Sequence, residues 1–388
     1  MFRPGSGCCN NPTMRIAILN LTGGGVSGGY KRYLSTMLPR LAASPQISEI
    51  LCASPSSFGV EKWAPATAKV KFTACEPFRF MRHAPDPGLK RALDEFRPDL
   101  IFVPIERHLR YRNVPVVTMV QNMGPLSGVK VVSGIVEKAK CLAQVFETRL
   151  ALKRSAAVIA PTEYVKNFLV RNLGLPAAKV QIINYGSSSV PRNVRPPAGL
   201  APMPGSFVFA AGSLEIYRGL EDLIKAMVPL KTAFPGLKLL LAGTARQATQ
   251  PYFQELKDLS SRSGVADDVL WLGDLPDEEL SWCYQNCSAF AMTSRVESFG
   301  FVALEALAHG CNCVSSDSPC LPEIFKDTAL YYRPGDSEAL AKSTGEILAR
   351  DPEEREKYKV KAFKRAWQFS WEEAAEKTIR LFTDVSGS

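Results

Sequence analysis

Residues 289–316 carry the pattern that most restricts how this chain can fold. Ala289 to Met292 is an apolar run typical of a buried strand, and a polar loop follows it. Phe301 to His309 has the character of a helix that ends at a glycine, and Cys313 to Ser315 can form the next strand. This order predicts a strand–loop–helix–strand unit, in which ligands bind at the carboxyl end of the first strand.

The start of the predicted helix favours an anion. The first amide groups of a helix lack partners inside it and attract negative charge, typically a phosphate. Glu297 and Glu305 flank these amides and lie eight positions apart. An acid in such a place can hold sugar hydroxyls while the amides hold the phosphate, although two acids at this spacing also occur by chance. We expect the amides of Gly300, Phe301 and Val302 to stabilise negative charge.

The rest of the chain shows two successive series of strands and helices. Apolar runs predict strands at 14–21, 49–53, 100–104, 114–120, 156–161 and 179–184, and then at 207–212, 237–241, 269–272, 289–292 and 313–315. The 388 residues suit two domains better than one. We expect an α/β fold of two Rossmann-like, doubly wound domains that face each other across a cleft.

Composition along the chain sets the expected boundaries. Residues 1–13 are polar, and we expect a flexible extension there. Residues 14–190 are assigned to a first domain and residues 207–370 to a second. The segment between them, 191–206, is assigned as the linker because it holds five prolines and no helical period.

A glycine-rich loop is expected after the first strand. Thr22 to Gly29 contains five glycines, and an amphipathic helix is expected from about Tyr30 to Leu41. Glycine lets the backbone approach a ligand closely. The loop is not a clean G-x-G-x-x-G, so it is a weak dinucleotide signal, and a plain tight turn is the alternative.

Composition excludes several classes of protein. An apolar content of 46% and a charged content of 22% are typical of a soluble globular chain, and no apolar run is long enough to cross a membrane. The ten cysteines follow no metal pattern, and with no secretory signal they favour a reducing cytoplasm. The net charge of +9 suits an anionic membrane surface or substrate, or dispersed solubility charge. No aromatic-interleaved basic motif indicates nucleic acid.

The run Glu297-Ser-Phe-Gly-Phe-Val-Ala-Leu-Glu305, followed by Ala-Leu-Ala-His-Gly, resembles the E-x7-E element of GT4-type retaining glycosyltransferases, which have the GT-B fold. The resemblance covers 207–382 strongly and 14–186 loosely. Gly28-Gly29 resembles the family's Gly-Gly loop at the cleft. Residues 371–388 resemble its final helix, which crosses back and completes the first domain.

The resemblance also implies roles for particular residues. Glu297 would hold hydroxyls of the donor sugar and Glu305 those of the ribose, neither acting as a covalent nucleophile. Arg218 stands where the family has a diphosphate-binding Lys, but Ser213 stands where it has an Arg, and Gln121 replaces a frequent His near the donor sugar. The implied catalytic residues are Glu297, Arg218 and Gln121, and the implied donor-binding residues are Gly28, Gly29, Ser213, Ser298, Phe299, Gly300, Phe301, Val302 and Glu305.

The implied reaction is transfer of a sugar, with retention and without a metal ion or other cofactor, from a nucleotide-diphosphate sugar. The acceptor would be a glycan, a lipid-linked or a small molecule, as in surface polysaccharide or glycoconjugate synthesis, in the cytoplasm or at the inner face of the membrane. Two alternatives stay open. One is a non-catalytic scaffold, which Ser213 and Gln121 favour, and the other is a nucleotide-sugar epimerase of the same fold. For Glu323 a binding role and a helix-start role are equally open. For His83 and His108 a solvated role is expected, with contact to an acceptor as the alternative.

Overall fold

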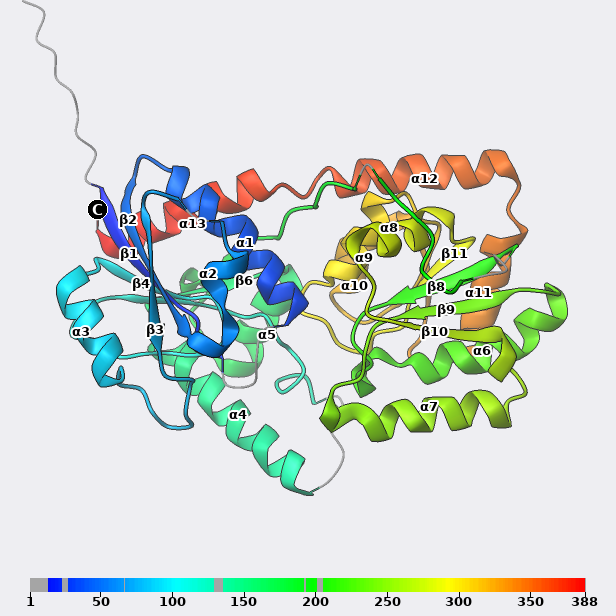
Figure 1. Cartoon of the computed structure of the whole chain (residues 1–388), viewed down its shortest axis with the longest axis horizontal. Coiled ribbons are helices and arrows are strands. Elements are labelled where there is room, and N and C mark those ends of the chain that lie inside the picture. Colours follow the sequence, from blue (N-terminus) through cyan, green and yellow to red (C-terminus); the bar gives the residue numbers. More distant parts are fainter. Residues whose placement is uncertain are drawn as a thin grey trace, which may run out of the picture.

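The computed structural model describes residues 13–22, 27–65, 67–128, 135–191, 193–200 and 205–387, with the side chains of 135–138 left out. It forms two lobes, one holding the first half of the chain and one the second (Figure 1). The expected extension at 1–13 lies almost wholly outside the described residues, as do residues 23–26 of the glycine loop and part of the expected linker.

The first lobe is built on a seven-stranded sheet whose paired strands all run parallel. Its order is β3-β2-β1-β4-β5-β6-β7, which reverses direction beside β1, as in doubly wound folds. The strands are β1 (Met14–Leu19), β2 (Ile47–Pro55), β3 (Val70–Cys75), β4 (Leu100–Val103), β5 (Val116–Met119), β6 (Ala157–Ala160) and β7 (Val180–Ile182).

The second lobe repeats this plan with six parallel strands in the order β10-β9-β8-β11-β12-β13. The strands are β8 (Phe207–Ala211), β9 (Lys238–Ala242), β10 (Val269–Gly273), β11 (Ala289–Met292), β12 (Cys313–Ser316) and β13 (Ala329–Tyr332). The central strand β11 is buried at every position, because helices cover both faces of the sheet. Two Rossmann-like domains are therefore confirmed.

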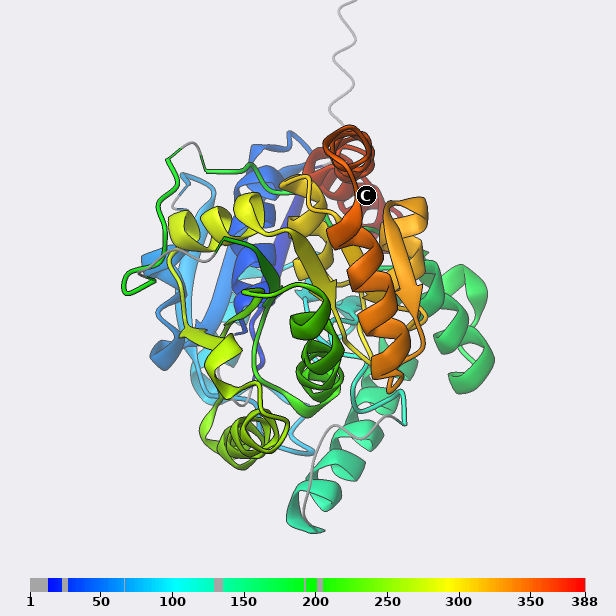
Figure 2. The same cartoon turned by 90° about the vertical axis from the view of Figure 1, so that its right-hand side faces the viewer.

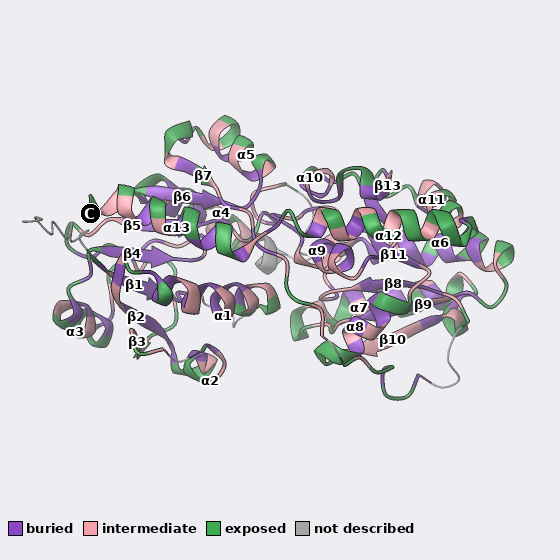
Figure 3. Cartoon of the chain, turned by 90° about the horizontal axis from the view of Figure 1, so that it is seen from above, coloured by how far each residue is buried: buried purple, intermediate pink, exposed green. Residues whose placement is uncertain are grey.

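Helices surround both sheets with buried inner faces and exposed outer faces (Figure 3). Those of the first half are α1 (Gly28–Ala43), α2 (Val60–Trp63), α3 (Pro87–Phe96), α4 (Ile135–Arg154) and α5 (Glu163–Leu173). Those of the second half are α6 (Leu220–Ala233), α7 (Gln250–Arg262), α8 (Asp277–Asn286), α9 (Phe301–Ala308), α10 (Leu321–Phe325), α11 (Ser337–Ala349), α12 (Pro352–Ala366) and α13 (Trp371–Ser386). Figure 2 shows α4, in teal green, projecting away from the body of the molecule.

The last helix returns to the first lobe. The chain runs along α12 on the second lobe and crosses over to α13, which packs on α1 and β4 (Figure 1). Ser370 begins α13 by accepting a hydrogen bond from the backbone N of Glu373, as capping serines do. A large apolar core includes buried residues from both sheets, such as Phe102 of β4 and Phe290 of β11. This core and α13 hold the two lobes together.

Candidate active site

A cleft of about 1030 Å³ lies between the lobes. Its lining includes every residue that we assigned to catalysis or donor binding, namely Gly28, Gly29, Gln121, Ser213, Arg218, Glu297, Ser298, Phe299, Gly300, Phe301, Val302 and Glu305. The residues come from the ends of strands and the starts of helices in both domains. Their individual roles stay predictions, and the geometry below shows what each could do.

The amino end of α9 opens into the cleft. Gly300 precedes the helix with a φ of 91°, a conformation that favours glycine. Its carbonyl accepts hydrogen bonds from the amides of Ala303 and Leu304. The amides of Gly300, Phe301 and Val302 have no hydrogen-bond partner among the described residues. Three free donors at the positive end of a helix make a suitable anion site.

A second helix starts at the same cleft. Gly28 and Gly29 lie in the first turn of α1, not in the preceding loop as expected, because the side chain of Ser27 caps the helix through the amide of Tyr30. A Cβ atom on Gly29 would lie 3.1 Å from the ring of Phe301. Glycine at this position thus lets the starts of α1 and α9 approach closely from opposite domains.

Arg218 and Glu297 form an ion pair on the floor of the cleft. Nη1 of Arg218 donates hydrogen bonds to Oε1 of Glu297 at 2.5 Å and to Oγ of Ser294 at 3.2 Å. Each charged side chain is only 14% exposed. Burial is the largest influence on Arg218 and opposes its charge, but Glu297 and then Tyr217, Tyr284 and Glu215 together outweigh it, so the pKa of the guanidinium is raised. The Nε of Arg218 is buried without a hydrogen-bond partner among the described residues, so this donor of the guanidinium is unsatisfied in the structure.

Gly212, which follows strand β8, leaves room for the guanidinium group of Arg218. A Cβ atom on Gly212, whose φ is 121°, would lie 3.2 Å from Cζ of Arg218. Ser213 lines the cleft next to it, and so does Arg246, which follows β9. The Nε of Arg246 lies 4.0 Å from a carboxylate oxygen of Glu215. Arg246 is therefore a second cation on the donor side of the cleft, which the sequence pattern did not single out.

Glu305 connects the two domains. Its carboxylate pairs with Arg32 of α1 and accepts a hydrogen bond of 2.9 Å from the hydroxyl of Tyr284. The predicted contact with ribose hydroxyls therefore requires Arg32 to move or to share the carboxylate.

Gln121 also contacts the opposite domain. Its backbone carbonyl accepts a 2.6 Å hydrogen bond from Oγ of Ser298, and its side chain donates to the carbonyl of Pro104. Thr162 of the first domain donates in turn to the carbonyl of Ser298. The side chain of Gln121 is thus used to hold neighbouring loops, and its carbonyl faces the loop that carries Glu297.

Glu106 is a functional candidate that the sequence analysis missed. It follows β4, lines the cleft and is only 8% exposed. Its carboxylate accepts hydrogen bonds from the backbone amides of Gln121 and Asn122. Burial raises the pKa of this carboxyl group, although the amides act in the opposite direction. An acid three residues after a buried strand was the one available signal, and it is a common pattern.

The aromatic rings of Phe299 and Phe301 pack against residues of the first domain. The ring of Phe299 is 1% exposed and packs against Tyr185. The ring of Phe301 stacks on Tyr185 at 4.5 Å, and Trp371 lies behind both. These aromatic side chains therefore join the two domains, which leaves mainly their backbone atoms for a ligand.

Glu323 and two histidines are placed differently from the expectation. The Glu323 carboxylate accepts hydrogen bonds of 2.9 and 2.6 Å from the amides of Glu163 and Tyr164, so it caps α5 of the other domain. His83 and His108 are not solvated: His108 is buried, and the ring nitrogens of His83 are buried without a hydrogen-bond partner among the described residues, Nε2 lying 4.0 Å from a carboxylate oxygen of Glu147 on α4. Burial and then His83 lower the pKa of His108 to about 4.

No group of three or more His, Cys, Asp or Glu side chains within the described ranges could hold a metal ion. Within the same ranges, no helix is both long and apolar enough to cross a membrane.

Two Rossmann-like domains with a cleft between them and a returning final helix define the GT-B class of fold. Two family models match consecutive parts of this chain. Residues 27–186 match the model described as Glycosyltransferase Family 4, and residues 195–365 match the model described as Glycosyl transferases group 1. The chain therefore belongs to the GT4-type glycosyltransferase family.

Curated relatives are similar over part of their length. O-antigen chain mannosyltransferase B of Escherichia coli is 26% identical over 243 residues, which cover 60% of this chain and 61% of that protein. D-inositol 3-phosphate glycosyltransferase of Corynebacterium urealyticum is 28% identical over 214 residues, which cover 54% of this chain and 50% of that protein. The chain thus spans about half to three-fifths of the length of these relatives.

Solved structures share the fold over nearly the whole chain. Sucrose-phosphate synthase of Thermosynechococcus elongatus has a TM-score of 0.74 at 18% identity and covers 96% of this chain and 99% of its own. HepE of Anabaena, solved with UDP-glucose, has a TM-score of 0.72 at 18% identity, with 96% and 100% covered. At this identity the likeness extends to the fold alone.

Proposed function

We propose that this chain transfers a sugar from a nucleotide-diphosphate sugar to an acceptor hydroxyl, with retention of configuration and without a metal ion. The observation that carries the proposal is the group of free amides at the start of α9, which open into the interdomain cleft beside Arg218 and Glu297. UDP-glucose in HepE and the transferase names of the relatives support this class of donor.

In the proposed reaction the diphosphate lies against the amides of Gly300, Phe301 and Val302. Arg218 and these amides stabilise the charge that develops as the bond between the anomeric carbon and the phosphate oxygen breaks. The acceptor oxygen bonds to the anomeric carbon, and its proton passes to the departing phosphate oxygen. Glu297 holds the hydroxyls of the sugar, and protein charge takes the place of a metal ion. Retention is supported by the resemblance of residues 297–305 to the family element.

The test is a hydrolysis and transfer assay across nucleotide-diphosphate sugars, with and without EDTA. We expect slow hydrolysis of at least one donor without an acceptor, no loss of activity in EDTA, and a product whose anomeric configuration by NMR equals that of the donor. Loss of activity in EDTA or inversion would refute that part of the proposal. Absence of turnover and of binding with every donor would favour the scaffold alternative.

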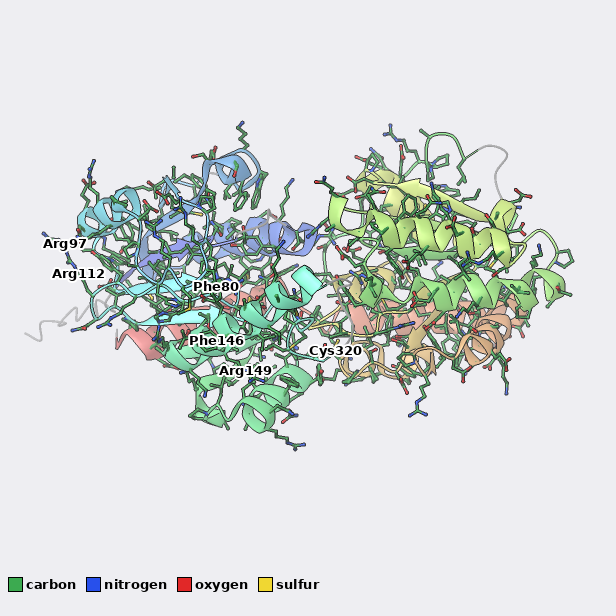
Figure 4. All side chains as sticks on the ribbon, turned by 90° about the horizontal axis from the view of Figure 1, so that it is seen from below. Phe80, Arg97, Arg112, Phe146, Arg149 and Cys320 are labelled. Atoms are coloured by element: carbon green, nitrogen blue, oxygen red, sulfur yellow. The ribbon has the colours of Figure 1, made fainter. Side chains whose placement is uncertain are left out.

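We also propose that the first domain works at an anionic membrane surface. Figure 4 shows Phe80, Phe146 and Arg149 on one face of this domain. Four apolar side chains of the first domain are each more than half exposed: Phe80, Met81, Leu142 and Phe146. Leu142, Phe146, Arg149 and Lys153 recur along α4 at helical spacing, so they share one side of the helix. We call these six residues the α4 surface.

The α4 surface combines apolar groups that can enter a bilayer with cations that attract anionic headgroups. The side-chain charges of Arg149 and Lys153 have no acidic partner within the described residues. Lys140 and Gln144 of the same helix line the cleft, so a surface-bound acceptor would lie close to the site.

Sedimentation with vesicles tests this placement. We expect the chain to bind phosphatidylglycerol vesicles but not phosphatidylcholine vesicles, and the double variant Phe80→Ser, Phe146→Ser to bind at least tenfold more weakly. Trp367→Ser is the matched control, because Trp367 is a 79% exposed aromatic residue on the other domain. Equal binding by both variants would refute the proposal.

A further inference from the structure

The wall of the cleft formed by the first domain carries one acidic side chain among the described residues, that of Glu106. The second domain contributes the acids Glu215, Asp274, Glu297 and Glu305 to the lining. The first domain contributes only Glu106 among the residues that the structure describes. None of the donor roles proposed above uses Glu106, so this buried carboxylate needs a separate explanation.

The two oxygens of Glu106 have different surroundings. Oε1 accepts hydrogen bonds from the backbone amides of Gln121 and Asn122, the second at 2.5 Å. No other described residue donates to Oε2, and this atom is not among the buried polar atoms that lack a partner. Since Glu106 lines the cleft, Oε2 is the oxygen of this carboxylate that can meet a ligand there. One oxygen fixes the carboxylate, and the other is held in place as a hydrogen-bond acceptor.

The wall around Glu106 suits a ligand with several hydroxyl groups. Asn122, Lys140 and Gln144 line the same cleft; the side-chain amides of Asn122 and Gln144 can donate and accept hydrogen bonds, and the ammonium group of Lys140 can donate them. Asn122 is held in turn, since its side chain accepts a 2.9 Å hydrogen bond from the amide of Gly124. Ile105 and Met123 add apolar area that can pack on the face of a ring. A rigid acid with amide groups and apolar area beside it is a pre-organised site for a polyol.

We propose that Glu106 binds the acceptor, with Oε2 accepting a hydrogen bond from the hydroxyl group that receives the sugar or from its neighbour on a polyhydroxylated, sugar-like molecule. This inference rests on the proposed function and names the class of its second substrate. It assigns Glu106 a binding role that orients the acceptor toward the anomeric carbon, while the departing phosphate still takes the proton.

Glu106→Gln separates this role from a structural one. The backbone amides of Gln121 and Asn122 need an oxygen, so the glutamine oxygen must face them and its NH₂ group must face the cleft. The substitution therefore keeps the loops in place and turns the acceptor at the cleft into a donor. Glu95→Gln is the matched control, because Glu95 is an exposed acid of α3 in the same domain and does not line this cleft.

The experiment uses the donor that the unmodified chain hydrolyses fastest, with methyl α-D-mannopyranoside and methyl α-D-glucopyranoside as acceptor probes. We expect Glu106→Gln to raise the KM for the better probe at least tenfold, with donor hydrolysis and donor KM changed by less than twofold. Glu95→Gln should change none of these values. An unchanged probe KM would overturn the proposal, and so would donor hydrolysis that falls in parallel with transfer.

If the unmodified chain hydrolyses no nucleotide sugar, the proposed function fails before Glu106 is tested. If it hydrolyses a donor but transfers to neither probe, the donor chemistry stands and the polyhydroxylated acceptor class is overturned.

Discussion

At the scale of single residues, the ion pair between Arg218 and Glu297 makes the sharpest prediction. Glu297→Gln should lower kcat at least about 100-fold, because a group that holds the sugar in the transition state loses its charge. It should also cost about 3 kcal/mol of unfolding free energy, since Arg218 stays buried without its partner. Steady-state kinetics and thermal unfolding measure the two effects.

Glu338→Gln, which changes an exposed acid of the same domain, is the control and should alter neither value. A Glu297→Gln variant with normal kcat would remove Glu297 from the mechanism. A Glu297→Gln variant with normal stability would mean that the buried charge of Arg218 does not need Glu297 as its partner.

Glu106 predicts a pH dependence of stability. Burial raises the pKa of its carboxyl group, so the folded chain binds this proton more tightly than the unfolded chain. Its contribution to stability is therefore present below the ordinary pKa of about 4.3 and is lost as the pH rises to the raised value. Glu106→Gln cannot titrate and keeps an oxygen for the amides. Its stability relative to the unmodified chain should increase across this interval in denaturant titrations at several pH values, and a constant difference would contradict the assignment.

At the scale of helices and strands, the junction between β7 and α13 depends on a glycine. A Cβ atom on Gly186 would lie 2.2 Å from the backbone N of Trp371 and 2.4 Å from its Cγ. Gly186→Ala should therefore push α13 from the first domain and cost about 1–3 kcal/mol of unfolding free energy. Gly205→Ala is the control, because nothing lies within 4 Å of its Cβ position. Equal unfolding midpoints in urea would show that α13 moves freely.

The elements that the sequence predicted are those with the strongest local signals. The apolar run Ala289–Met292 is strand β11, and the helix expected from Phe301 to His309 is α9, which ends at Ala308. Helix α12 was not predicted, because it is mostly charged and buries only Ala362 and Ala366, too thin an apolar stripe to recognise. Edge strand β3 has no fully buried residue, so its pattern is equally weak.

The residues of the site likewise divide into those with a local sequence signal and those without one. The amides after Gly300 and the acids around them were predictable because they belong to one continuous segment. The contacts of Glu305 with Arg32 and of Gln121 with Ser298 join residues far apart in the chain, and no local pattern encodes them. Glu106 was missed for the same reason, since its partners lie on another loop.

At the scale of the whole molecule, Glu323 links the domains by capping α5 from α10. Glu323→Ala should make the amides of Glu163 and Tyr164 exchange hydrogen faster, at a cost of about 1–3 kcal/mol. Asp351→Ala is the matched control, since Asp351 caps α12 within the second domain through the amide of Glu354. Hydrogen–deuterium exchange should show the effect of Asp351→Ala on α12 alone. Unchanged exchange at α5 in Glu323→Ala would mean that this contact does not hold the domains together.

The central claim is that the start of α9 holds the diphosphate, and calorimetric titration of Val302→Pro against Val302→Ala with UDP and with uridine tests it most directly. Both variants replace the branched valine side chain, but only proline removes the amide N–H, and proline is tolerated in the first turn of a helix. We predict that UDP binds Val302→Pro about 10- to 100-fold more weakly than Val302→Ala, as expected for one hydrogen bond to a charged group, while uridine binds both equally. Equal UDP affinity in the two variants would contradict the account.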